Sequence, residues 1–122
     1  YVTLNSLAEA CRGTTTVNEL QIVDVSNILQ PETVNIIQMK GPKGLGLDGN
    51  NLFVCDDDLG VIVFDLTAPT FPVAIDTLAG FTAHDVITDN GNLLVVSEDG
   101  LRQFNYTDIS NISLISFLDL ND

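Results

Sequence analysis

Three consecutive aspartates are the first residues of this chain whose types and spacing suggest ligand binding. Asp56, Asp57 and Asp58 follow a short apolar run, and carboxylate oxygens are the ligands that hard cations such as Ca²⁺ prefer. A calcium loop, however, places its ligands at alternate positions and ends on a bidentate glutamate, and this run does neither. Glu98 and Asp99 stand at the equivalent place about 41 residues later. This recurrence favours a solvated turn over a cation site.

The single histidine, His84, is the next candidate, because histidine titrates near neutral pH. It lies 41 residues after Lys43, and each stands at the entrance of a predicted strand, the innermost of its repeat. A general base needs a nucleophile or a second acid within hydrogen-bond reach. The sequence has no Gly-x-Ser-x-Gly elbow, phosphate-binding glycine loop or His-Glu-x-x-His pattern. We therefore predict a structural or channel-lining histidine, no catalytic residue and no enzyme.

The charge balance excludes two classes of partner. Seventeen acidic residues stand against four lysines and arginines, which gives a net charge of -13. Nucleic acids and anionic membrane surfaces both require clustered Lys and Arg, so neither is expected to bind. No run of 18 apolar residues is present, so this segment is not expected to insert into a membrane.

Short apolar runs recur about every 41 residues, a period typical of β-propeller blades. Asn51–Val54 recurs as Asn92–Val95, and Leu20–Ser26 precedes Val61–Thr67 by the same interval. Runs of β-branched and aromatic residues between Gly, Asn, Asp and Pro predict eleven strands and no helix. The predicted strands are Tyr1–Leu4, Leu20–Val25, Thr33–Gln38, Gly44–Leu47, Leu52–Cys55, Gly60–Leu66, Val73–Thr77, Ala83–Thr88, Leu93–Ser97, Leu101–Tyr106 and Ser113–Leu118.

Grouped in fours and lettered a to d, these strands predict an all-β fold, a partial β-propeller of nearly three four-stranded antiparallel blades. The first blade (residues 1–40) contains strands b to d, and the second and third span residues 41–80 and 81–122. No linker divides the chain, so we predict one domain, 1–122. Closed propellers have roughly 4–8 blades. We therefore expect a fragment of a longer chain, with a piece that closes with partner chains as the alternative.

The largest interruption of the repeat is the segment Asn5–Asn18, which contains Cys11. The equivalent b–c loop has about four residues in the second blade and three in the third. Insertions in repeat proteins lie in loops on one face, often the binding face. We therefore expect this insertion to mark the functional face.

Two strands and the turns that follow them resemble the LVIVD repeat, a β-propeller family named after this strand. The matching segments are Leu20–Ser26, followed by Pro31, and Val61–Thr67, followed by Pro69 and Pro72. The resemblance implies a propeller fold over nearly the whole chain.

Four further segments look like the C-terminal part of bacterial LVIVD-repeat lipoproteins: Tyr1–Leu4, the loop around Cys11, Gly44–Gly46 and Leu52–Cys55. The third copy departs from the family pattern at Arg102–Tyr106, which is more polar. The resemblance implies an exported protein of the cell surface, outer membrane or periplasm with no assigned catalytic activity. It also implies a lipid anchor in an N-terminal region that precedes these residues.

The two cysteines, Cys11 and Cys55, fall in or beside b–c loops of adjacent blades, which emerge on the same face. In an exported protein such a pair favours a disulfide, which would fix the insertion to the neighbouring blade. The alternative is two separate thiols, with Cys55 buried at a strand end. Two cysteines and one histidine at these spacings match no zinc pattern. We predict no metal centre, with Ca²⁺ at Asp56–Asp58 as the one cofactor left open.

The b–c and d–a loops together form the predicted binding face. Its candidate residues are Lys40, Lys43, Asp56, Asp57, Asp58, Phe81, His84, Glu98 and Asp99. We predict a non-catalytic binding or scaffold module of the bacterial envelope whose partner is a protein or a glycan. One alternative is an enzyme with an active site at the channel mouth, completed by blades absent from this chain. A purely structural spacer is the other.

Overall fold

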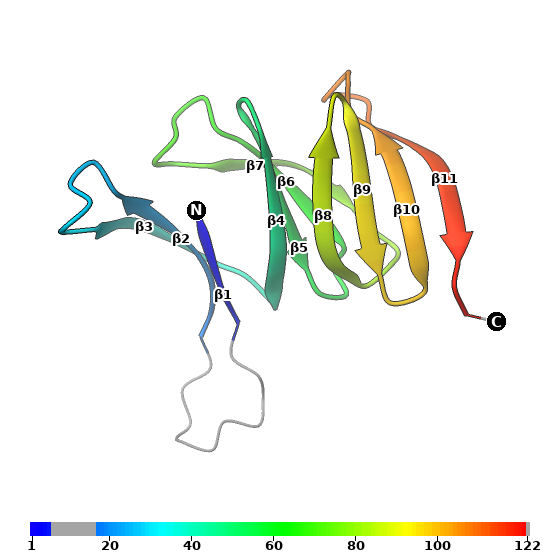
Figure 1. Cartoon of the computed structure of the whole chain (residues 1–122), viewed down its shortest axis with the longest axis horizontal. Coiled ribbons are helices and arrows are strands. Elements are labelled where there is room, and N and C mark those ends of the chain that lie inside the picture. The colour runs from blue at the N-terminus through cyan, green and yellow to red at the C-terminus, as the bar shows by residue number, and fades with distance from the viewer. Residues whose placement is uncertain (6–16, 122) are drawn as a thin grey trace, which may run out of the picture.

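The structure, a computed structural model, describes residues 1–5 and 17–121. The described residues form eleven β-strands in three antiparallel sheets and contain no helix (Figure 1). Each of the eleven predicted strands is present, with its ends within two residues of the expected ones. The all-β fold class is therefore confirmed.

The three sheets follow one another along the chain, and each is a simple meander. The N-terminal sheet contains β1 (Val2–Asn5), β2 (Asn18–Asp24) and β3 (Glu32–Gln38). The middle sheet contains β4 (Pro42–Asp48), β5 (Asn51–Asp56), β6 (Val61–Asp65) and β7 (Val73–Leu78). The C-terminal sheet contains β8 (Ala83–Asp89), β9 (Asn92–Ser97), β10 (Gly100–Asn105) and β11 (Ser113–Asp119).

The sheets are stacked face to face, and their first strands lie side by side. Strand β4 packs against both β1 and β8 (Figure 1). A Cβ atom added at Gly44 would lie 2.0 Å from Oδ1 of Asp85, so only glycine allows β4 and β8 to approach this closely. Thr3 Oγ1 donates a hydrogen bond to the carbonyl of Lys43 at 2.6 Å, which joins β1 to β4 in the same way.

The middle sheet is covered on both faces, so β5 reads as a continuous apolar run rather than an alternating one. One face of this sheet shares a core with the N-terminal sheet, and the other shares a core with the C-terminal sheet. The first core consists of Leu20, Ile22, Leu52, Val54, Phe64 and Leu66. The second consists of Phe53, Cys55, Val61, Val63, Leu78, Ala83, Val86, Leu93, Val95, Phe104 and Tyr106.

Hairpin turns repeat at one end of the stack. Asn90 and Gly91 join β8 to β9 with φ angles of 46° and 84°. Two consecutive residues with positive φ match the right-handed twist of the flanking strands, and Asn-Gly is the preferred pair for this turn. The turn fixes the register that pairs Asp89 with Asn92.

The stack is open. The N-terminal sheet has three strands where the other two have four, and the three sheets do not close into a ring. The structure thus establishes three stacked antiparallel sheets, and the propeller assignment remains a proposal. Within the described residues, no helix has the length and apolar character needed to span a membrane.

Candidate functional site

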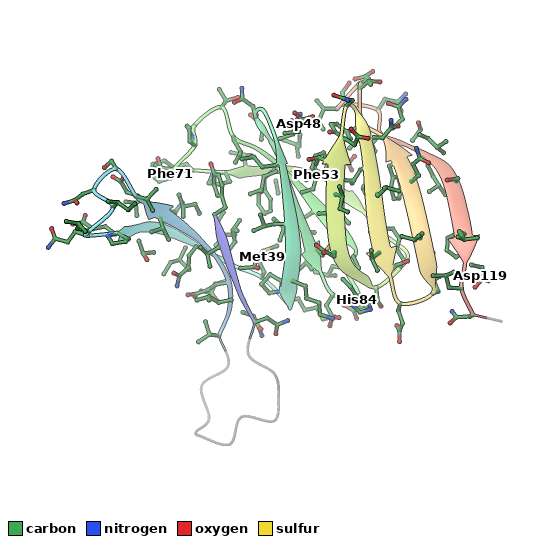
Figure 2. The ribbon with its side chains drawn as sticks, in the orientation of Figure 1. Met39, Asp48, Phe53, Phe71, His84 and Asp119 are labelled. Atoms are coloured by element: carbon green, nitrogen blue, oxygen red, sulfur yellow. The ribbon has the colours of Figure 1, made fainter. Side chains whose placement is uncertain are left out.

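The predicted binding-face residues lie at one end of the stack, which we call the polar end. It is formed by the loops after β3, β5, β7 and β9 and is the lower end in Figure 1. Figure 2 shows His84 at this end and Asp48 and Phe71 at the opposite one. The predicted candidates Lys40, Lys43, Asp56–Asp58, Phe81, His84, Glu98 and Asp99 all belong to these loops or to the strand ends beside them.

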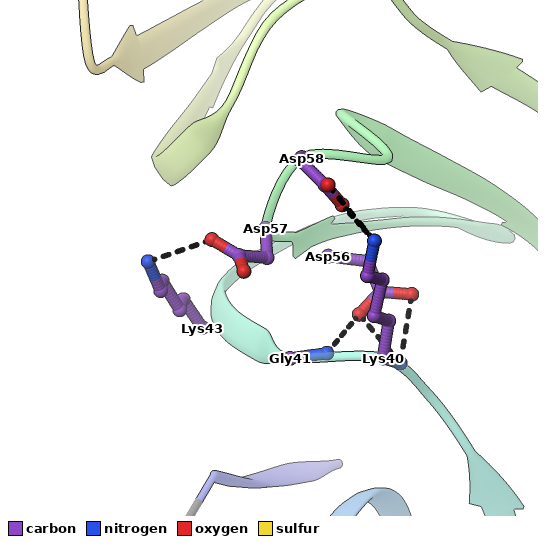
Figure 3. A network of polar contacts seen from close by, with 6 residues as sticks. All are labelled: Lys40, Gly41, Lys43, Asp56, Asp57 and Asp58. Atoms are coloured by element: carbon purple, nitrogen blue, oxygen red, sulfur yellow. Dashed lines mark hydrogen bonds and ion pairs between the residues drawn. The ribbon is translucent and has the colours of Figure 1, made fainter. Parts of the chain in front are cut away.

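The Asp56 carboxylate is buried, with 3% of the residue exposed, and is bound by backbone N–H groups. It accepts hydrogen bonds from the N–H of Gly41 at 2.7 Å and of Lys40 at 3.0 Å (Figure 3). Hydrogen bonds from amides to a carboxylate are charge-assisted and short. Asp56 therefore holds the β3–β4 loop against the end of β5. Its carboxylate is engaged in this structural role.

Asp57 has a backbone conformation that non-glycine residues rarely adopt, with φ of 53°. Its carbonyl accepts hydrogen bonds from Gly60 and from Ala83, the latter at 2.9 Å, so this turn also joins the middle sheet to β8. Its Oδ1 lies 3.2 Å from the ammonium nitrogen of Lys43 (Figure 3). Aspartate tolerates this left-handed conformation better than most residues do.

Lys43 and His84, which occupy equivalent positions in the repeat, are brought together. The Lys43 Nζ lies 3.3 Å from Nδ1 of His84. Because an ammonium group can only donate, this contact requires Nδ1 to be the unprotonated nitrogen. The pair spans β4 and β8 and extends the polar network from the middle sheet to the C-terminal sheet.

Asp58 forms an exposed ion pair with Lys40. Its carboxylate oxygens lie 2.6 Å and 2.8 Å from Nζ of Lys40 (Figure 3). The hydrogen bond from the ammonium group to Asp58 raises the pKa of Lys40 above its ordinary value. This contact is freely accessible to solvent, and such pairs contribute little to stability.

The three aspartates therefore point to different partners rather than to one centre. Among residues 1–5 and 17–121, no group of three or more Asp, Glu, His or Cys side chains is arranged to hold a metal ion. The geometry gives no support to Ca²⁺ at Asp56–Asp58, because one carboxylate is bound by backbone amides and the other two by lysines.

A second polar cluster at this end centres on Arg102, which sequence analysis missed. Its guanidinium pairs with the Asp99 carboxylate, with Nη2 2.9 Å from Oδ2, and also donates to Ser97 Oγ. It lies between two aromatic rings, 4.5 Å from the centroid of Phe81 and 4.2 Å from that of Phe117. The hydrogen bond from Arg102 holds the pKa of Asp99 well below its usual range.

The signal that points to this cluster is the placement of an arginine in a chain with only four basic residues, on a strand whose counterpart β6 is apolar there. Of the remaining candidates, Phe81 packs against the second core as well as against Arg102. Glu98 donates its backbone N–H to the carbonyl of Thr82 at 3.0 Å and has an exposed side chain.

Cys55 is a fully buried free thiol in the second core. Burial raises its pKa to about 12, and the negative charge of Asp85 adds to this shift. A thiol that stays protonated is a poor nucleophile and a poor metal ligand. Cys11, its predicted disulfide partner, lies outside the described residues, and no disulfide is present among those that the structure describes.

An apolar hollow lies at the opposite end of the stack, away from all the predicted candidates. A groove of about 400 Å³, mostly apolar, is lined by Tyr1, Ile22, Val23, Asp24, Val25, Ser26, Val34, Pro69 and Thr70. The Tyr1 hydroxyl donates to the carbonyl of Pro69 at 2.8 Å and bridges the two sheets beside it.

Comparisons with known proteins identify no relative: no family model, no curated protein and no solved structure matches the chain. The likeness of Leu20–Ser26 and Val61–Thr67 to the LVIVD repeat thus stays a resemblance in sequence.

Proposed function

We propose that this chain is part of a β-propeller and acts as a non-catalytic binding or scaffold module, with the polar end as its binding face. The propeller assignment is supported by the repetition of one packing relationship. Strand β1 lies against β4 as β5 lies against β8, and the 41-residue period accounts for it. The remaining blades would come from the same longer chain or from partner chains.

The observation that carries the binding role is the concentration of basic side chains at this end. Lys40, Lys43 and Arg102 are three of the four basic residues in a chain with a net charge of -13. Each of them is held by an aspartate from the same group of loops. Fixed donors and acceptors of both signs, on loops anchored by Asp56, suit hydrogen bonding to a glycan or to a polar protein surface.

The surroundings of Cys55 and of the paired aspartates favour binding over catalysis. The pKa of Cys55 is raised to about 12 by burial, so this thiol is no nucleophile at neutral pH. The carboxylates of Asp57 and Asp58 pair with lysines, and Asp99 is kept ionised by Arg102. A general acid or base needs a pKa near the working pH, and neither Cys55 nor Asp99 has one.

A location in the bacterial envelope, with a lipid anchor outside these residues, is proposed on the LVIVD resemblance alone. It agrees with an acidic surface, which keeps a protein soluble and limits self-association.

The proposal is tested by direct binding measurements with bacterial envelope glycans and purified envelope proteins. The double variant Lys40→Ala/Lys43→Ala should lose binding, whereas Gln30→Ala, an exposed change at the opposite end, should retain it. Equal binding by both variants would refute the polar end as the binding face. Turnover of a glycan or peptide substrate by the intact chain would instead favour an active site at the channel mouth.

A further inference from the structure

The middle and C-terminal sheets are two copies of one repeat, so their faces can be compared position by position. The face of the middle sheet toward the C-terminal sheet carries five apolar residues: Phe53, Cys55, Val61, Val63 and Leu78. All five are between 0% and 8% exposed. A sheet of the same repeat covers this face completely.

The repeat puts Leu94, Val96, Leu101, Gln103 and Leu118 at the equivalent positions of the C-terminal sheet. The strand register places them on one face, because Val96 pairs with Leu101, Leu94 with Gln103 and Leu101 with Leu118. Residues directly opposite each other on antiparallel strands share a face. Four of the five are apolar, which matches the covered face of the middle sheet.

This surface is uncovered in the structure. Leu94, Val96 and Leu118 are 39%, 42% and 57% exposed, and Ile87, which pairs with Leu94 on the same face, is 57% exposed. We call Ile87, Leu94, Val96, Leu101 and Leu118 the open face. A contiguous apolar face of this kind marks an interaction site.

We propose that the open face is the docking surface for a further four-stranded antiparallel sheet of the same repeat, joined after β11 as β8 is joined after β7. This inference rests on the propeller part of the proposed function. The chain already contains one example of such an occupant, the C-terminal sheet. The side of β8–β10 that covers the middle sheet presents Val86, Leu93, Val95 and Phe104, each less than 9% exposed.

The connection is also favourable in geometry. Residues 79–82 join the end of β7 to the start of β8 at the polar end. Strand β11 ends at that same end of the stack, beside the open face (Figure 1). A connection of the same length would therefore bring a following strand to the position over β8.

The open face places two demands on its occupant, because Asp85 and Ile87 stand where β4 has Gly44 and Gly46. Gly46 of β4 faces β8, and a Cβ atom there would lie 3.2 Å from Thr88 Cγ2 and 3.3 Å from Val86 Cγ2. Ile87 occupies the position equivalent to Gly46 and carries four more carbon atoms. The strand that covers β8 must therefore have residues smaller than Val86 and Thr88 opposite Ile87.

The test uses Val96→Cys, because Val96 is equivalent to the buried Cys55, which serves as the reference for a covered thiol. In the 122-residue chain the introduced thiol should react rapidly with an alkylating agent, with Cys11→Ser leaving the buried Cys55 as the only other thiol. In a chain lengthened by a second copy of residues 82–120, with Asp85→Gly, Val86→Ala and Thr88→Ala in the added copy to accommodate Asp85 and Ile87 of the first copy, labelling should be about 100-fold slower.

The matched control has Leu93→Asp and Val95→Asp in the added copy, which cannot dock, and should label as fast as the original chain. Equal labelling with and without the added repeat overturns the proposal, and so does an added repeat that leaves the circular dichroism signal of β-structure unchanged. Protection that grows with the concentration of the 122-residue chain would identify a second copy as the occupant and also overturn it. Thiol protection requires no ligand, so this result is independent of binding at the polar end.

Discussion

The carboxylate of Asp56 lies 2.7 Å from the backbone nitrogen of Gly41, and this contact joins the end of β5 to the loop that leads into β4. It separates Asp56 from its two neighbours in function, because Asp57 and Asp58 reach outward to lysines. One acidic run thus contains a structural anchor and two exposed surface groups.

Replacing Asp56 with alanine should lower the free energy of unfolding by about 2 kcal/mol, because two backbone donors lose a buried charged acceptor. Asp56→Asn keeps one acceptor oxygen and should lose less. The exposed Asp58→Ala is the matched control and should change stability by about 0.5 kcal/mol or less. Urea denaturation measures all three, and equal losses for Asp56→Ala and Asp58→Ala would rule out the anchoring role.

Asp99 should contribute to the acid sensitivity of the fold. Arg102 lowers its pKa in the folded state, so its contribution is present above the unfolded pKa of about 4 and is lost as pH falls through the folded pKa. Asp99→Asn should therefore be less stable than the wild type at pH 7, and the two stabilities should converge at lower pH. Thermal unfolding across an acid pH series tests this. A difference in stability between Asp99→Asn and the wild type that stays constant with pH would argue against the ion pair.

Tyr106 should ionise at unusually high pH. Burial raises its pKa to about 12, and the hydrogen bond from its hydroxyl to Asp48 Oδ2, 2.6 Å long, adds to the shift. The protonated phenol stabilises the folded state, and this stabilisation is fully present below the unfolded tyrosine pKa of about 10. It is lost as pH rises toward 12. Asp48→Asn should lower the pKa of Tyr106. The absorbance of tyrosinate measures this pKa, and Tyr106→Phe identifies the part of the signal that comes from Tyr106. A Tyr106 pKa at its ordinary value would contradict the contact with Asp48.

The Cys55 thiol should resist alkylation in the folded protein and react on unfolding, because it is fully buried and its pKa is about 12. Mass spectrometry after alkylation in denaturant, without reductant, counts the free thiols directly. A mass lower by two hydrogens, with Cys55 unreactive even when unfolded, would show a disulfide to Cys11 instead.

The sequence allowed the strands and their order to be predicted because short-range signals determine them: turn residues end each apolar run, and the 41-residue period relates the copies. The same period showed that Lys43 and His84 occupy equivalent positions, but it did not predict that they lie 3.3 Å apart. The different roles of Asp56 and Asp57 could not be predicted in this way, because they depend on a positive φ at Asp57 and on backbone amides of the β3–β4 loop. The Arg102 cluster was missed because Phe81 reaches it from the β7–β8 loop and Phe117 from β11.

The central claim is that these sheets are consecutive members of one stack, in which only the middle sheet is covered on both faces. Native-state hydrogen exchange measures this most directly, because amides open with free energies that follow local burial. The account predicts the strongest protection in β5, whose residues from Leu52 to Asp56 are all buried, and weak protection in β11, which is exposed throughout. Equal protection of β5 and β11 in the 122-residue chain would contradict it.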